Sequence, residues 1–253
     1  MQPHALVDIG INLAHDSYDA DRPAVVERAL AAGVRRMVVT GSSLDSARRA
    51  IELCRQWPGL MRATAGIHPH HAHDFKAQDQ AELAGLLGDP MVTSAGECGL
   101  DYFRDFSPRA EQRQAFIRQL DLAASMRKPV FLHQRDAHAD FMAILRDYLP
   151  SLPAAVVHCF TGNGPELDEY LGQGLYVGLT GWICDERRGL GVRDLIPAIP
   201  LERLMIETDG PYLLPRNIRP KPAHRRNEPM NLRHVFEAIC AARPEPAALI
   251  AAA

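Results

Sequence analysis

The feature that most constrains this chain is an alternation of short apolar runs with helix-like stretches, repeated eight times in 253 residues. Each run is rich in Val, Ile, Leu and Ala and has the length of a strand. The predicted strands are Ala5–Asn12, Arg36–Gly41, Met61–His68, Met91–Gly99, Pro129–Gln134, Ala155–Thr161, Leu175–Ile183 and Leu204–Asp209. Strands that alternate with helices form parallel sheets, and eight such units in this length predict an α/β fold, a (β/α)8 TIM barrel.

The intervening stretches predict the outer helices of such a barrel. They are Pro23–Ala32, Leu44–Arg55, Gln80–Leu87, Arg109–Arg127 and Ala139–Tyr148. No G-x-G-x-x-G motif follows the first strand, which weakens the alternative of an open dinucleotide-binding sheet. No linker, low-complexity segment or charge run divides the chain, so we expect one domain over residues 1–253.

Composition limits the class of protein. A hydrophobic content of 47% and a charged content of 23% are typical of a globular protein with a sizeable core. The five cysteines are an odd number without C-x-x-C spacing, which disfavours a disulfide framework or a zinc knuckle. No leader and no apolar stretch of about 18 residues is evident, so we expect a cytoplasmic protein that does not enter a membrane. The net charge of −3 provides no general attraction for nucleic acid, so an anionic substrate must be held by local basic groups or metal.

Four acid or imidazole side chains stand at the ends of four predicted strands: Glu97, His133, His158 and Asp209. Side chains alternate across a strand, and this alternation is consistent with all four pointing into the barrel, whereas Cys98 and Cys159 point away. One strand-end histidine or carboxylate is usually structural. Four at the rim where (β/α)8 barrels carry their chemistry predict a mixed nitrogen and oxygen site for a divalent metal.

A denser histidine cluster follows the third strand. His68 ends this strand and could face the site, whereas His70, His71 and His73 fall in a loop after Pro69. Because proline disfavours helix at the preceding residue, a helical pair of zinc ligands is not expected here. Arg104 and Arg135 closely follow the fourth and fifth strands and could contact an anionic substrate. Three aromatic residues could stack on a nucleobase, although packing is the commoner role: Phe160, Trp182 and Tyr212.

Six segments together resemble a known family, the TatD-type metal-dependent deoxyribonucleases. They read GECGLDYFRDFSPRAEQ (Gly96–Gln112), HQRDAH (His133–His138), HCFTG (His158–Gly162), TGWICDERRGL (Thr180–Leu190), IETDGPYLLPR (Ile206–Arg216) and RRNEP (Arg225–Pro229). The resemblance runs in order from about Val7 to Arg243. It implies a TIM-barrel hydrolase that cleaves phosphodiesters with divalent metal. Its bacterial members imply a 3′→5′ exonuclease acting on single-stranded DNA and RNA.

The resemblance also implies site residues. Glu97, His133, His158 and Asp209 match the metal ligands of the family. Most relatives carry D-x-H-x-H on the first strand, where this chain has Asp8-Ile9-Gly10-Ile11-Asn12. The bacterial subgroup shares this change, which puts a permanently occupied second metal site in doubt. The chain ends in LIAAA, short of the usual last segment of the family, so we expect a truncated last helix.

These inferences combine into one expected mechanism. Glu97 and Asp209 are the expected catalytic carboxylates: Glu97 holds the metal with His133 and His158, and Asp209 acts as the general base on the attacking water, supported by Glu207. Further expected substrate contacts are Asn12, His68, Arg104 and Arg135. Mg²⁺ is the expected metal, with Mn²⁺ or Zn²⁺ as alternatives and a second ion recruited with the substrate. We expect a monomer without an obligate protein partner.

Two other functions remain open at this point. One is a related hydrolase of esters or amides, such as a lactonase, a cyclic amidase or an aminoacyl-tRNA deacylase. It would turn over an ester or amide and leave phosphodiesters intact. The other is a non-catalytic protein that binds nucleic acid with metal and does not cleave it.

Overall fold

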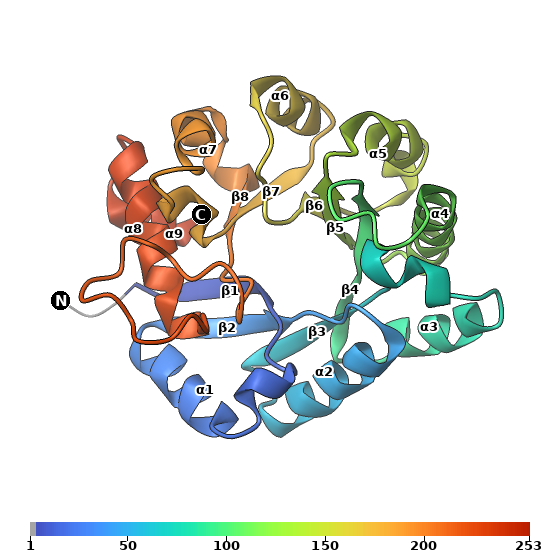
Figure 1. Cartoon of the computed structure of the whole chain (residues 1–253), viewed down its shortest axis with the longest axis horizontal. Helices are drawn as coiled ribbons and strands as arrows, with labels where there is room; N and C mark the ends of the chain where they lie inside the picture. Colours follow the sequence, from blue (N-terminus) through green and yellow to red (C-terminus); the bar gives the residue numbers. More distant parts are fainter. Residues whose placement is uncertain (1–3) are drawn as a thin grey trace. The chain divides into compact units, whose positions relative to one another are not determined.

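The computed structural model describes residues 4–253 and contains an eight-stranded sheet with the strands in chain order, β1 to β8. The strands are β1 (Leu6–Ile11), β2 (Val34–Val39), β3 (Met61–Ala65), β4 (Val92–Asp101), β5 (Val130–Arg135), β6 (Ala155–Val157), β7 (Tyr176–Leu179) and β8 (Leu204–Ile206). The pairs β3–β4, β4–β5, β5–β6 and β7–β8 are parallel. Figure 1 shows how strands and helices alternate along the chain. This order confirms the predicted (β/α)8 class.

Helices follow the strands as predicted. They are α1 (Arg22–Ala31), α2 (Leu44–Gln56), α3 (Asp79–Leu87), α4 (Arg109–Ser125), α5 (His138–Leu145), α6 (Gly164–Gly172), α7 (Leu190–Leu195), α8 (Leu232–Ala242) and α9 (Ala247–Ala252). Two begin with capping boxes that satisfy free backbone amides, Ser43 with Ser46 in α2 and Asn163 with Glu166 in α6. Within residues 4–253, no helix is long and apolar enough to cross a membrane.

The chain divides into two compact units. Unit 1 comprises Met1–Val38 and Cys159–Ala253, and unit 2 comprises Val39–His158. In unit 2 the helices α2 to α5 lie along β3 to β5 (Figure 1). The core of unit 2 includes the stacked rings of Phe116 on α4 and Phe141 on α5, whose centroids are 5.3 Å apart. In unit 1, β1 meets the segment after β8, because Asp209 N donates to Gly10 O and Asn12 N donates to Gly210 O.

Several strands end earlier than the sequence predicts. β3 ends at Ala65 because Pro69 opens a short 3-10 helix, Pro69–Asp74, with His68 as its N-cap. β6 and β8 end at Val157 and Ile206, and Cys159 and Asp209 adopt positive φ angles of 47° and 51° shortly afterwards. His68, His158 and Asp209 therefore lie just beyond strands, whereas Glu97 and His133 lie within β4 and β5.

Candidate metal centre

An irregularity in β4 positions the first site residue. The Cα partners of Ala95 and Cys98 are Val130 and Leu132, so three steps along β4 match two along β5 and the simple alternation is interrupted. Gly96 lies in this bulge with φ +131°, and a Cβ there would lie 2.1 Å from Phe131 O. Only glycine tolerates both the angle and the close approach, so the sequence Gly96-Glu97 fits this turn of the strand.

Three donor atoms converge at one point, two from β4 and β5 and one from the residue that follows β6. Oε1 of Glu97 lies 2.8 Å from Nε2 of His158 and 3.1 Å from Nδ1 of His133, and the two nitrogens are 3.4 Å apart. His158 is held in place because its backbone amide donates to Leu132 O. Glu97 and His158 are buried, and the His133 side chain is 20% exposed. The structure therefore brings together three of the four predicted ligands, all within unit 2.

His68 is a fourth member of this cluster. Its Nε2 lies 3.3 Å from Oε1 of Glu97, and its ring centroid lies 4.4 Å from that of His133. Burial lowers the pKa of His68 to about 4, despite the opposing charge of Glu97. A neutral imidazole is the form that binds metal, so His68 is available as a further ligand or as a substrate contact.

The carboxylate of Glu97 is ionised in this setting. Burial alone would raise the pKa of its carboxyl group. The electrostatic influence of the adjacent His68 and His158 rings and the hydrogen bonds with His133 and His158 outweigh burial, and they hold that pKa well below its ordinary value. Burial opposes a charge on His133, yet hydrogen bonds to Asp101 and Glu97 raise its pKa. The site thus combines an anionic oxygen ligand with imidazoles on three sides.

The geometry of the three donors fits a divalent cation. Ligand atoms about 2.0–2.2 Å from one ion lie about 3–3.5 Å from one another. Two of the separations, 3.1 and 3.4 Å, fall within this range, and the third, 2.8 Å, is slightly shorter. The donor set of one carboxylate and two imidazoles suits Mn²⁺, Zn²⁺ or Mg²⁺ and offers no soft sulfur ligand.

Asp101 is a site residue that the sequence reasoning missed. It ends β4 with 3% of its surface exposed, and its Oδ2 lies 3.3 Å from Nε2 of His133 and 2.8 Å from Nε2 of His70. A carboxylate on the second nitrogen of a ligand histidine fixes the ring and its tautomer. Burial opposes ionisation of Asp101, but hydrogen bonds with His133 and His70 lower its pKa. His70, expected in a passive loop, is thereby tied to the cluster.

The remaining predicted carboxylate and amide lie together in unit 1. Nδ2 of Asn12 donates to Oδ1 of Asp209 at 3.1 Å. Glu207, two residues before Asp209, is fully buried and accepts the amide of Cys159 at 2.5 Å. Asp8 on β1 is also buried, and it accepts the backbone amide of Thr208 at 3.0 Å. The segment that carries Asp209 is therefore held firmly within its own unit.

The two predicted arginines lie in unit 2 against one aromatic ring. The guanidinium carbons of Arg104 and Arg135 lie 5.6 Å and 4.9 Å from the ring centroid of Phe103. Of the three aromatics proposed to stack on bases, Phe160 is only 3% exposed and belongs to the core, whereas Tyr212 is 54% exposed.

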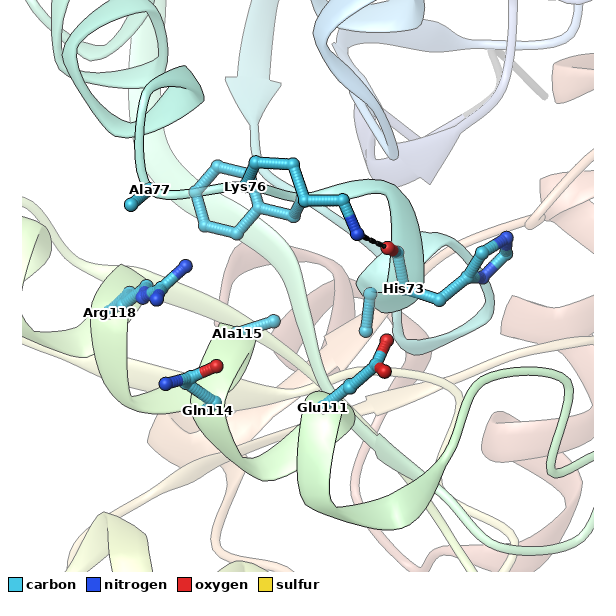
Figure 2. Close-up of a pocket in the computed structure, with 9 residues that line it drawn as sticks. His73, Lys76, Ala77, Glu111, Gln114, Ala115 and Arg118 are labelled. Atoms are coloured by element: carbon cyan, nitrogen blue, oxygen red, sulfur yellow. Dashed lines mark hydrogen bonds between the residues drawn. The ribbon is translucent and has the colours of Figure 1, made fainter.

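A separate pocket of about 210 Å³ lies between the Pro69–Asp74 helix and α4 (Figure 2). Lys76 and Arg118 are among its lining residues, and the ammonium of Lys76 donates to the carbonyl of His73. His73 in turn contacts the buried Ser107 at 2.8 Å. None of the predicted metal ligands lines this pocket.

A strand-ordered α/β barrel with a carboxylate and imidazoles gathered at strand ends is the architecture of a metal-dependent hydrolase. Comparison with known proteins agrees. The profile of the family described as TatD related DNase matches residues 7–253. A protein of Edwardsiella piscicida named 3′-5′ ssDNA/RNA exonuclease TatD is 53% identical over 232 residues, 92% of this chain and 89% of that protein. A protein of the same name from Erwinia tasmaniensis is 48% identical, and the match covers 98% of this chain and 95% of that protein.

Solved structures give the same result. The crystal structure of YjjV, a TatD homologue of Escherichia coli, has a TM-score of 0.89 at 28% identity, covering 98% of this chain and 94% of that one. A TatD family hydrolase of Entamoeba histolytica has a TM-score of 0.87 at 25% identity, covering 100% and 96%. The chain belongs to the family of TatD related DNases.

Proposed function

We propose that this protein is a metal-dependent 3′→5′ exonuclease that hydrolyses phosphodiester bonds in single-stranded DNA and RNA. The observation that carries the proposal is the triangle of Glu97 Oε1, His133 Nδ1 and His158 Nε2, with separations that suit one divalent ion. Two relatives, 53% and 48% identical, bear the name of this activity. The proposal extends that name to this chain.

Each residue has a defined task in the proposed reaction. When bound, a divalent ion polarises the phosphoryl group and makes water a better nucleophile. Glu97, His133 and His158 hold this ion, and Asp101 keeps the His133 ring in the orientation that presents Nδ1. We assign Asp209 as the fourth ligand and the general base, on its position after β8 and on the family motif it matches. Asn12 hydrogen-bonds to that carboxylate and orients it.

The metal and the setting are also part of the proposal. We propose Mg²⁺ or Mn²⁺ in the cell, with a second ion that enters with the substrate phosphate, because Gly10 on β1 and Asn12 directly after it offer no imidazole. We further propose a monomer that works in the cytoplasm. Among the described residues, which include all five cysteines, no disulfide is formed, as is typical of a reducing compartment.

The direct test is a gel time course with a 5′-labelled single-stranded oligonucleotide. With Mg²⁺ we expect a ladder that shortens one nucleotide at a time from the 3′ end, and with EDTA no cleavage. Early mid-chain products, or equal cleavage in EDTA, would contradict the proposal. Turnover of an aminoacyl ester or a lactone without cleavage of the oligonucleotide would favour the ester hydrolase instead.

A further inference from the structure

The loop between β4 and α4 exposes the two phenylalanines that the core leaves out. Phe103 and Phe106 are 56% and 64% exposed. The other six phenylalanines of the chain are each 7% exposed or less: Phe75, Phe116, Phe131, Phe141, Phe160 and Phe236. Exposing two large apolar rings so close together in one loop costs hydrophobic free energy, so this loop is a candidate binding surface.

The loop is firmly anchored at both ends. Oδ1 of Asp101 accepts the backbone amides of Phe103 at 3.0 Å and Arg104 at 2.8 Å. Gln112 on α4 donates from Nε2 to Ser107 O at 2.8 Å and accepts the amide of Asp101 at 2.9 Å. The exposed rings therefore sit on a rigid support, and a ligand that covers them does not have to order a flexible loop.

The same loop is connected to the metal cluster. The ring of Phe106 packs against His70 with centroids 4.7 Å apart. His70 contacts Oδ2 of Asp101, and this same oxygen contacts His133, one of the three converging donors. Phe106 is thus connected to the proposed metal ligand His133 through two residues, His70 and Asp101.

Positive charge surrounds the second ring. The guanidinium groups of Arg104 and Arg135 both lie over Phe103, at 5.6 Å and 4.9 Å from its centroid. Contacts of this kind use the face of a guanidinium, and Nε of Arg135 also lies 3.8 Å from Oδ1 of Asp136. Two cationic groups therefore lie against the ring of one exposed residue of this loop.

We propose that this loop, residues 102–108 with Arg135, is a platform for single-stranded nucleic acid: Phe106 stacks on a base, and Arg104 and Arg135 bind the adjacent backbone phosphate. This inference rests on the proposed exonuclease function and adds a binding subsite to it. The combination of an exposed ring with oriented guanidiniums matches a strand whose bases and phosphates alternate. A duplex keeps its bases stacked inside, so the ring of Phe106 would find no free base face there.

The test uses matched variants and two oligonucleotides. The variants are Phe106→Ala, Phe106→Trp and the pair Arg104→Ala with Arg135→Ala. The controls are Ile117→Ala, a 38% exposed apolar residue on α4, and Arg118→Ala, which lines the separate pocket of Figure 2. The substrates are a fluorescein-labelled ten-thymidine strand and the same strand with its three 3′-terminal bases removed. KM and kcat are measured with Mg²⁺, and the Kd by fluorescence anisotropy in EDTA.

We expect Phe106→Ala to raise KM about tenfold on the intact strand, since stacking on one base contributes roughly that factor. Its kcat and its metal affinity stay unchanged, Phe106→Trp keeps the wild-type KM, and the effect disappears on the base-free strand. The arginine pair should flatten the dependence of log Kd on log salt by about 0.7 for each phosphate that the variant no longer binds. Both controls should behave as the wild type.

Failure of this inference and failure of the exonuclease proposal are distinguishable. If the wild type cleaves but Phe106→Ala matches Ile117→Ala, or acts equally on the base-free strand, the platform is refuted and the exonuclease stands. If the wild type does not cleave, the Kd values from anisotropy test the platform by themselves. Weaker binding by Phe106→Ala and the arginine pair than by the wild type and both controls supports the platform. If the wild type does not bind the strand, both proposals are overturned.

Discussion

At the scale of single residues, Oε1 of Glu97 is the atom on which the site is built. His158, His133 and His68 approach it at 2.8, 3.1 and 3.3 Å. A carboxylate this buried is stable as an anion because imidazoles surround it. A cation bound by the same atoms would displace the protons that lie between the imidazole nitrogens and the carboxylate. Metal binding should therefore release protons and weaken as the pH falls.

Asp101 gives a prediction on metal affinity. In Asp101→Asn, Oδ1 still accepts the amides of Phe103 and Arg104, but the new amide nitrogen cannot accept from His133 or His70. Metal affinity should fall about 10- to 100-fold in calorimetry while the fold is kept. Asp105→Asn is the matched control on the same loop, because Asp105 is exposed and pairs with Arg109 at 3.2 Å rather than with a histidine of the cluster. Equal affinities for the two variants would refute the positioning role.

Asp8 gives a prediction on stability and pH. Burial raises the pKa of its carboxyl group from 3.8 to about 7, although hydrogen bonds from Thr208 oppose the shift. Below about pH 4 the carboxyl is protonated in both states, so it costs no stability. As the pH rises from 4 to 7 the unfolded chain ionises first, and the folded state loses up to about 4 kcal/mol relative to a neutral side chain.

Asp8→Asn should therefore be more stable than the wild type at pH 8, with a difference that shrinks toward pH 4. The amide can still accept the Thr208 amide and donate to its hydroxyl. Urea unfolding at pH 4.5 and 8 measures the two free energies of unfolding. A difference that is the same at both pH values would show that Asp8 is ionised in the folded protein throughout.

The residue scale also shows where sequence reasoning stopped. Glu97, His133 and His158 are predicted as ligands from the sequence because each ends or nearly ends an apolar run. Asp101 has the same parity as Glu97, but the predicted strand ended at Gly99, since glycine and aspartate disfavour strands. The strand continues to Asp101 because Gln112 on α4 binds both its amide and its carbonyl, a tertiary contact that no local pattern reveals.

At the scale of elements, β4 carries the geometry of the site. Its bulge places Glu97, and its two positive-φ glycines let β5 approach closely. Gly99 has φ +145°, and a Cβ there would lie 1.9 Å from His133 O. The backbone of His133, a proposed metal ligand, can therefore lie this close to β4 only because residue 99 has no Cβ.

Gly99→Ala should destabilise the protein by more than about 2 kcal/mol, because strain in φ adds to the clash, and should also weaken metal binding as His133 moves. Gly85→Ala is the control: Gly85 lies in α3 with open space around it, and alanine there should stabilise by up to about 1 kcal/mol. Thermal unfolding and calorimetry measure both effects. A Gly99→Ala protein as stable as the wild type would contradict the packing described for β4.

The ends of the strands are harder to predict from the sequence than the order of strands and helices. The strand and helix order followed from periodicity, whereas β3, β6, β7 and β8 end a few residues early, at Ala65, Val157, Leu179 and Ile206. In β7 the cause is Thr180, whose hydroxyl caps a 3-10 helix, Gly181–Cys184, where an apolar run had predicted more strand. Capping by a hydroxyl competes with the strand ladder, and the apolar pattern does not distinguish the two.

At the scale of the whole molecule, the fold class follows from the eightfold alternation, and the family match over residues 7–253 agrees with it. The net charge of −3 provides no broad attraction for a duplex, so binding must come from local arginines and metal. We predict that a single strand is digested faster than a blunt duplex of the same sequence at equal ionic strength. Equal initial rates in a gel time course would contradict this preference.

The most direct test of the central claim compares metal content and cleavage in the same samples. Wild type and Glu97→Ala are stripped with EDTA, titrated with Mn²⁺ in a calorimeter, and then assayed on a 5′-labelled single strand. We predict that the wild type regains stepwise 3′ cleavage in proportion to bound metal. The folded Glu97→Ala protein should bind at least about 100-fold more weakly and cleave at least about 100-fold more slowly. Wild-type cleavage by Glu97→Ala, or by stripped wild type without metal, would contradict the account.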